Sequence, residues 1–169
     1  TLVLWLVVVS LIRIEYSDHS AGLENQVIVK SFIKFTGWSV IAVGKLFFLS
    51  VEMIQFDLIS VNNFTMRIAP ECTIFDYYIF VIALAIFARW TIKYKIINTL
   101  IIIGILCFIN ALRFIIMSFV GKYYPAAFDP AHDYLWNILF AFITFGLWLW
   151  RNNRSEFISS KKELSKAKA

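Results

Sequence analysis

The sequence contains few of the residues that break helices or cross-link small folds. Its 169 residues include 3 prolines, 6 glycines and 2 cysteines. Two cysteines exclude a disulfide-stabilised scaffold. Cys72 lies just before an apolar run and Cys107 lies inside the next one, so the two thiols are expected at different depths and not as a pair. One thiol and one histidine supply too few ligands for a metal site, and no cofactor is predicted.

Acidic residues are also scarce, so the placement of the positive charge is informative. There are 11 Asp and Glu residues against 16 Lys and Arg residues, a net charge of +5. The basic residues stand at the ends of apolar runs and in the C-terminal tail, a distribution typical of a membrane protein. Nucleic acid is therefore not predicted as a partner, whereas membrane lipid is.

Long apolar runs are abundant. Hydrophobic residues make up 60% of the chain, with 17 Phe and 6 Trp. Helices of a soluble domain carry a polar face, but the longest runs here are apolar nearly all round. We therefore expect a mainly α fold, a polytopic transmembrane helical bundle that forms one domain over residues 1–150. The predicted spans are 1–12 (the remainder of a truncated first helix, not a signal peptide), 26–44, 74–88, 96–120 and 134–150.

One segment between the predicted spans is typical of strands. Residues 46–70 contain two runs rich in strand formers, with Asn62-Asn63 between them as a turn. This pattern favours a short β-hairpin before Cys72. An open sheet edge is not stable inside a bilayer, so the hairpin is expected outside the membrane, packed against the helix ends.

Charge predicts the orientation of the chain. The loop 89–95 and the tail 151–169 are both basic, so both are expected in the cytoplasm. An even number of spans separates them, which makes the assignment consistent. Cys72 and the loop 121–133, which carries His132, then lie on the external face of an inner (plasma) membrane.

Arg113 is the most informative single residue. It stands about seven residues from the outer end of the span 96–120, where a charge costs on the order of a few kcal/mol. An intramembrane arginine is therefore a functional candidate. The alternative is an arginine that snorkels to lipid head groups. Asn110, three residues earlier, shares its helix face and is a candidate to orient the guanidinium.

Cys72 and His132 are the other two candidates. Cys72 follows Pro70 in the first turn of a predicted span, where a helix N-terminus and a nearby arginine would favour a thiolate. The alternative is an inert small hydrophobe. His132 is a candidate general base, with Asp129 or Asp133 as its orienting partner, and the sequence does not choose between them. The alternative for His132 is a solvated loop residue.

Together these three residues predict a reaction class. A Cys72 thiolate would attack a carbonyl carbon, His132 would take or return a proton, and Arg113 would stabilise the developing oxyanion. The pattern therefore predicts acyl transfer through a thioester.

At these residues the chain resembles the exosortase/archaeosortase family of membrane cysteine transpeptidases. The resemblance covers about residues 35–150 and rests on three motifs in order: Glu71-Cys72-Thr73 at the head of a span, Asn110-Ala111-Leu112-Arg113 in the next span, and His132 before the last. Family members often carry Ser-Gly or Thr-Gly after the cysteine, where this chain has Thr73-Ile74. Many have a glycine shortly after the histidine, where this chain has Trp136. These departures suggest a divergent member, compact or truncated at its N-terminus.

The resemblance implies a cysteine nucleophile at Cys72, a transition-state arginine at Arg113 and a catalytic histidine at His132. It also implies the substrates, which are secreted envelope proteins ending in a sorting signal made of a short motif, a transmembrane helix and a basic tail. The enzyme would cleave near the motif and transfer the new C-terminus to a lipid or glycan acceptor or to water. Two alternatives remain: a non-enzymatic membrane subunit of a transporter or polysaccharide-export assembly, and an acyltransferase acting on lipid.

Overall fold

The fold is mainly α, as the sequence predicts. The computed structural model describes residues 27–88 and 90–167, so the predicted first span, 1–12, lies outside the described residues. The main helices are α3 (Val27–Leu46), α4 (Phe75–Phe87), α5 (Ile92–Tyr123) and α7 (Trp136–Ala167). The short helical turns are η1 (Pro70–Thr73), η2 (Pro125–Ala127), α6 (Phe128–Pro130) and η3 (Ala131–Leu135).

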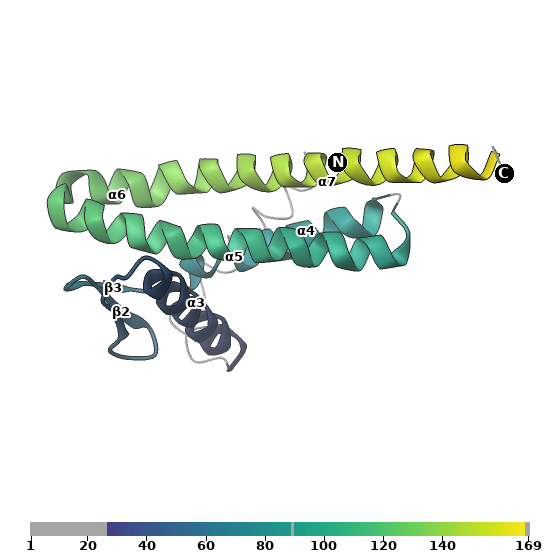
Figure 1. Cartoon of the computed structure of the whole chain (residues 1–169). Helices are drawn as coiled ribbons and strands as arrows, with labels where there is room; N and C mark the ends of the chain where they lie inside the picture. Colours follow the sequence, from purple (N-terminus) through teal and green to yellow (C-terminus); the bar gives the residue numbers. More distant parts are fainter. Residues whose placement is uncertain (1–26, 89, 168–169) are drawn as a thin grey trace.

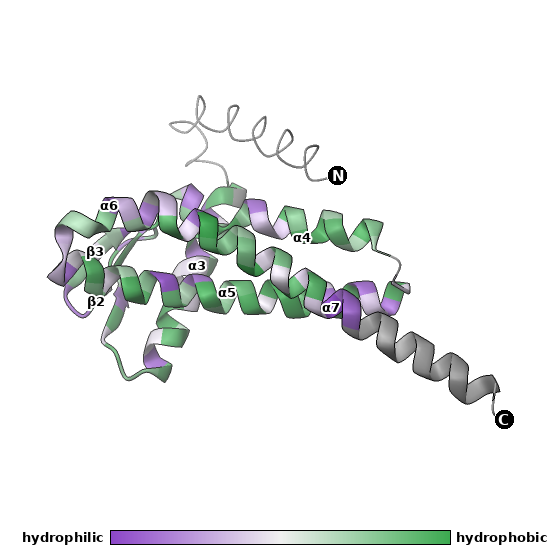
Figure 2. Ribbon diagram, turned by 90° about the horizontal axis from the view of Figure 1, so that it is seen from above, coloured by the Kyte–Doolittle hydropathy of each residue, from purple (hydrophilic) through white to green (hydrophobic). Residues whose placement is uncertain are grey.

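Helix α5 is the centre of the arrangement. Helices α5 and α7 run side by side in opposite directions, with α4 against both of them and α3 crossing α5 (Figures 1 and 2). Within the described part of the chain, α5 is the helix long and apolar enough to cross a membrane. Its 32 residues give a length of about 48 Å, against a hydrocarbon core of about 30 Å.

Three predicted boundaries are wrong. The basic loop expected over residues 89–95 is shorter than predicted, because α5 begins at Ile92 and includes Lys93 and Lys95. Residues 121–133 were expected to form a loop, but they are largely helical: α5 continues to Tyr123, and three short turns then lead into α7. The tail after residue 150 was expected to be separate from the last span, but α7 continues through it to Ala167. The bond from Arg151 Nε to Asn98 Oδ1, 3.0 Å long, extends the contact between α7 and α5 past the predicted boundary.

The predicted hairpin is present as part of a three-stranded antiparallel sheet in the order β1-β2-β3. Its strands are β1 (Val51–Met53), β2 (Leu58–Val61) and β3 (Phe64–Arg67). Asn62 and Asn63, with φ of 50° and 66°, form the turn between β2 and β3, since asparagine tolerates the left-handed region that two-residue hairpins require. The first arm of the prediction is wrong in one respect: bends at residues 54–57 divide it into two strands.

The sheet lies against α3 and α5 through close backbone approaches. Strand β1 packs on α3 and β3 packs on α5. At three glycines, a side chain of the sheet occupies the space that a Cβ atom would fill. The side chain is Met53 at Gly37, Val51 at Gly44 and Phe64 at Gly121. Gly37 and Gly44 of α3 therefore allow close packing, with strand β1 as the neighbour.

A second feature of the helices is their outward apolar surface. Large hydrophobic side chains are exposed along α4, α5 and α7, and the parts of these helices that are coloured by hydropathy in Figure 2 are mainly apolar. They include Ile82, Ile86, Phe87, Leu100, Ile116, Ile138, Phe142 and Phe145. Exposed apolar side chains on neighbouring helices form the kind of surface that marks a membrane or protein contact.

Replacing Gly44 with alanine is expected to destabilise the fold, and Gly104→Ala is the matched control. The added methyl at Gly44 would clash with the Val51 side chain, whose Cβ lies 3.3 Å away and whose branched rotamer is stiff. Overpacking of this kind costs about 1–3 kcal/mol. Nothing lies within 4 Å of a methyl at Gly104, so Gly104→Ala gains about 0.5–1 kcal/mol of helix propensity. Thermal unfolding in detergent measures both, and equal midpoints would contradict the close approach.

Candidate active site

The backbone around Cys72 is a short, bonded turn between the sheet and α4. Pro70 opens the 3₁₀ turn η1, the Cys72 amide donates to the Ala69 carbonyl at 2.9 Å, and the Thr73 hydroxyl donates to the Pro70 carbonyl at 2.7 Å. Ile74 then adopts φ 51°, ψ 25° before α4 begins. Cys72 therefore lies in a turn that precedes the helix and not, as predicted, in the helix's own first turn.

Ile74 is the strained residue of this turn. A branched side chain in the left-handed region is a genuine outlier, and such positions cost on the order of 1–3 kcal/mol. Ile74 is buried at 3% exposure among α4, α5 and α7 residues, so core contacts hold the conformation. The reversal at Ile74 separates the thiol-bearing turn η1 from α4.

Asn110 holds the Cys72 turn from α5. Its amide Nδ2 donates to the Cys72 carbonyl at 2.9 Å, and both residues are buried. Asn110 was predicted to orient the Arg113 guanidinium, and it lies one turn before that residue on α5. Its Oδ1, however, accepts no hydrogen bond from the described residues, so this role is wrong. Asn110 acts on the backbone of Cys72 instead.

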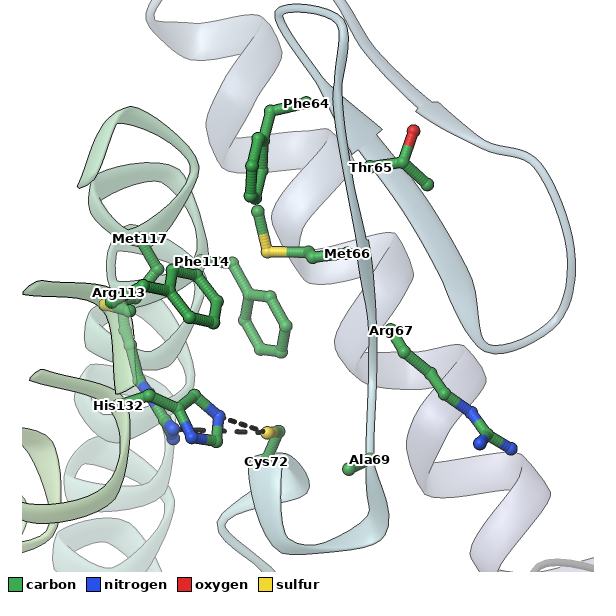
Figure 3. A pocket seen from close by; sticks show the side chains of 11 residues that line it. Phe64, Thr65, Met66, Arg67, Ala69, Cys72, Arg113, Phe114, Met117 and His132 are labelled. Carbon is green, nitrogen blue, oxygen red and sulfur yellow. Dashed lines mark hydrogen bonds between the residues drawn. The ribbon is translucent and has the colours of Figure 1, made fainter. Parts of the chain in front are cut away.

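The imidazole of His132, in the turn η3 that leads into α7, contacts the Cys72 thiol. Its Nε2 lies 3.2 Å from Cys72 Sγ, across 60 residues of sequence (Figure 3). The residue sits in the π-helical turn η3, a geometry that often occurs at functional sites. The Phe128 ring, one turn earlier, stacks on the imidazole with centroids 5.9 Å apart and planes 9° apart. His132 is half-buried, so the alternative of a solvated loop residue is excluded.

Arg113 approaches the same sulfur atom from α5. Its guanidinium nitrogen lies 4.0 Å from Cys72 Sγ, and the residue is 5% exposed. An arginine buried to this extent inside the protein does not snorkel to lipid head groups, so that alternative is wrong. Among the described residues no carboxylate pairs with Arg113. A buried cation without an anion is costly, and a thiolate or an oxyanion at this position would compensate it.

A cavity of about 340 Å³ opens onto the three side chains. Its volume lies at the lower end of the range of about 300–1,000 Å³ found for small-molecule sites. Cys72, Arg113 and His132 line one part of it, and the remainder is mainly apolar (Figure 3). The apolar lining consists of Phe64, Met66, Ala69, Phe114, Met117 and Phe128.

The remaining predicted residues contribute differently. Asp129 is exposed on α6, and no described bond joins it to His132. The side chain of Asp133 lies outside the described part of the chain. Cys107 is partly buried and contacts Ser39 Oγ at 3.2 Å, away from the candidate site.

Sequence reasoning missed the apolar cavity wall. Phe64 and Met66 were read only as strand formers, and Phe114 and Met117 only as part of an apolar span. One signal was present: Met117 follows Arg113 by four positions and therefore shares its helix face. No comparable signal linked β3 to this face, because their contact depends on the tertiary fold.

No protein-family model, curated protein or solved structure matches this chain. The chemical interpretation therefore rests on the geometry. A thiol within hydrogen-bond distance of an imidazole and beside a buried guanidinium has the components of an activated nucleophile.

Cys72 is expected to react with iodoacetamide much faster than Cys107. Cys72 Sγ lies within hydrogen-bond distance of the His132 imidazole, a potential proton acceptor, and beside the Arg113 guanidinium, whereas Cys107 contacts a hydroxyl. Replacing His132 with glutamine should slow alkylation of Cys72 by about tenfold or more and leave Cys107 unchanged. Peptide mapping by mass spectrometry over a time course measures both rates. Equal rates at the two cysteines in the wild type would contradict an activated thiol.

Asn110→Leu is expected to lower both stability and Cys72 reactivity. Leucine has a similar size but leaves the buried Cys72 carbonyl without its donor, which costs about 1–3 kcal/mol. The turn would then hold Sγ less firmly against His132. Asn110→Asp keeps the side-chain shape without the amide donor and should show the same loss. Thermal unfolding and iodoacetamide kinetics test the pair. A wild-type rate in both variants would show that the bond does not position the thiol.

Proposed function

We propose that this protein is a membrane-embedded cysteine peptidase or transpeptidase that cleaves C-terminal sorting signals of envelope proteins through a thioester. One observation carries the proposal: Cys72 Sγ lies 3.2 Å from His132 Nε2 and 4.0 Å from Arg113, in a cavity between three elements that are distant in sequence. The resemblance of these residues to the exosortase/archaeosortase motifs supports the same assignment.

The reaction divides into two halves. His132 takes the Cys72 proton, and the thiolate attacks the scissile carbonyl carbon. Arg113 donates to the oxyanion of the tetrahedral intermediate. His132 then protonates the departing amine, the C–N bond breaks, and the acyl group remains on sulfur as a thioester. In the second half His132 accepts a proton from the incoming nucleophile, water or an acceptor from a lipid or glycan, which attacks the thioester and releases Cys72.

The proposed function includes a polytopic arrangement, in which several helices cross the plasma membrane. The outward apolar side chains of α4, α5 and α7 suit contact with lipid. Arg113 lies ten positions before Tyr123, the last residue of α5, which is about 15 Å along the helix. With the basic segments in the cytoplasm, the candidate site lies near the external face.

The proposed substrate fits a site at this depth. A sorting signal places a short motif just outside a transmembrane helix, with a basic tail behind it in the cytoplasm. The helix would hold the motif at the height of Cys72, so the scissile bond reaches the cavity without the substrate leaving the membrane. Holding the two reactants together in this way lowers the entropic cost of the reaction.

The C-termini of envelope proteins test the proposal. Cells that carry the wild type are compared with cells that carry Cys72→Ala, and the C-terminal peptides are identified by mass spectrometry. A set of proteins should keep its terminal helix and basic tail in the mutant, and the wild type should show where they are cut. Cys107→Ala is the matched control and should process these proteins normally, because Cys107 lies away from His132.

The opposite result would favour a different class of protein. Identical C-termini in both strains, with Cys72→Ala produced and inserted normally, would show that Cys72 is not the nucleophile for these substrates. A non-enzymatic subunit of a transporter or of a polysaccharide-export assembly would then be the better assignment.

A further inference from the structure

Strand β3 borders the candidate cavity along its whole length. All of its residues from Phe64 to Arg67 line the cavity, and the strand runs beside it toward Cys72 (Figure 3). Successive side chains of a strand point to opposite faces. The side chains of Phe64 and Met66 point toward the cavity and those of Thr65 and Arg67 point away from it (Figure 3), so the cavity meets Thr65 and Arg67 at the main chain of the strand.

The hydrogen-bond pattern shows what that edge presents. Val61 pairs with Phe64 across the two-residue turn, and the Ile68 amide donates to the Asp57 carbonyl at 2.6 Å. Pairs alternate along an antiparallel ladder, so Phe64, Met66 and Ile68 direct their main-chain groups toward β2. The N–H and C=O of Thr65 must then point away from β2, at the outer edge of β3, and Thr65 is one of the residues that line the cavity.

The other walls of the cavity are mainly apolar. Strand β3 is an edge strand of the sheet in the described residues. Across the cavity, the Phe128 ring of α6 approaches Phe64 with centroids 6.1 Å apart, and Phe114 and Met117 of α5 form an apolar floor. The result is a groove with polar main-chain groups on one side, apolar side chains beneath, and Cys72 at one end.

We propose that the substrate binds as an additional strand on the edge of β3, with its main chain bonded to Thr65 and apolar side chains on the Phe114 and Met117 floor. This inference rests on the proposed function, since it concerns the same site. Strand addition gives affinity through main-chain bonds and specificity through alternate side chains. Recognition of the substrate would therefore require an extended conformation before the scissile bond.

The direction of the added strand follows from the proposed orientation. β3 runs from the hairpin turn, where Lys122 Nζ donates to the Asn62 carbonyl at 3.1 Å, toward Cys72. Lys122 lies near the external end of α5, so β3 runs inward. A substrate whose folded part is outside and whose helix is in the membrane also runs inward. The added strand is therefore parallel to β3, and Thr65 contacts the residues that precede the scissile bond.

A peptidyl chloromethyl ketone tests this binding mode on the full-length protein. The probe is an acetylated tetrapeptide of alanine and leucine. The Cys72 thiolate displaces its chloride, so a C–S bond forms and a C–Cl bond breaks. Versions carrying a single N-methyl group at each amide in turn remove one main-chain donor at a time. Iodoacetamide, which has no main chain to pair with β3, reports the intrinsic reactivity of Cys72.

Two protein variants complete the test. Thr65→Pro removes the outward N–H, and proline is tolerated there because that N–H does not bond β2. Thr65→Val keeps the N–H and the side-chain size. Loss of one main-chain bond should slow the peptide reagent about tenfold in Thr65→Pro. N-methylation at one of the amides should slow it similarly in the wild type. Iodoacetamide rates should remain unchanged in Thr65→Pro, and Thr65→Val, which keeps the main-chain N–H, should react with the peptide reagent faster than Thr65→Pro.

The outcomes separate the binding mode from the proposed function. If the peptide rate is unaffected by N-methylation at every position, or by Thr65→Pro in a protein that reacts normally with iodoacetamide, strand addition is wrong while the activated cysteine stands. If iodoacetamide does not discriminate Cys72 from Cys107, the proposed function fails and the binding mode fails with it. Should Thr65→Pro not fold, the N-methyl series on the wild type decides.

Discussion

The candidate site depends on a guanidinium buried beside a sulfur atom. Removing one charge from water costs several kcal/mol in a real protein. Arg113 bears this cost at 5% exposure, with Cys72 Sγ 4.0 Å from its guanidinium. A negative charge at that distance returns about 4 kcal/mol at an effective dielectric constant of 20. The neutral thiol returns little, whereas a negative charge that develops during a reaction, on sulfur or on the oxygen of a carbonyl under attack, would be stabilised by the guanidinium.

The fold brings three segments that are distant in sequence to one point. The turn η1 brings the thiol from the sheet, α5 brings the cation, and η3 brings the imidazole. Two local departures from regular structure occur at the join: the left-handed Ile74 and the π-helical turn at His132. Each is less favourable than the regular alternative, and each is retained beside the thiol. Strain held by a packed core in this way is typical of sites whose geometry must be maintained.

The parts of the fold governed by local chemistry could be predicted from the sequence. The apolar runs gave α3, α4, α5 and α7 to within a few residues at most ends, and Asn62-Asn63 gave the turn of the hairpin. Cys72, Arg113 and His132 stood out because charged or reactive residues at the ends of apolar helices are rare, and the structure brings them together. Their catalytic roles stay predictions.

The errors arose where tertiary contacts override local signals. The loop predicted over residues 121–133 contains two prolines. Pro125 opens the short turn η2, where its missing N–H costs little, and Pro130 ends α6 and caps η3. The orientation of the Asn110 amide depends on where the Cys72 carbonyl lies, which spacing along α5 does not determine. The pairing of β1 with β2 likewise depends on α3 beneath the sheet.

The edge of β3 links the requirements of stability and function. An edge strand is normally a liability, since its main-chain groups invite pairing with another chain, and within lipid such groups would be unsatisfied. Here the edge of β3 borders a cavity that is also lined by residues of α5 and α6. An edge strand on an open surface would pair with other chains and promote aggregation, whereas an edge strand inside a cavity pairs only with a chain that fits there. In the proposed binding mode, the chain that pairs with the edge of β3 lies in the cavity that leads to Cys72, so substrate binding and alignment for attack would be one event.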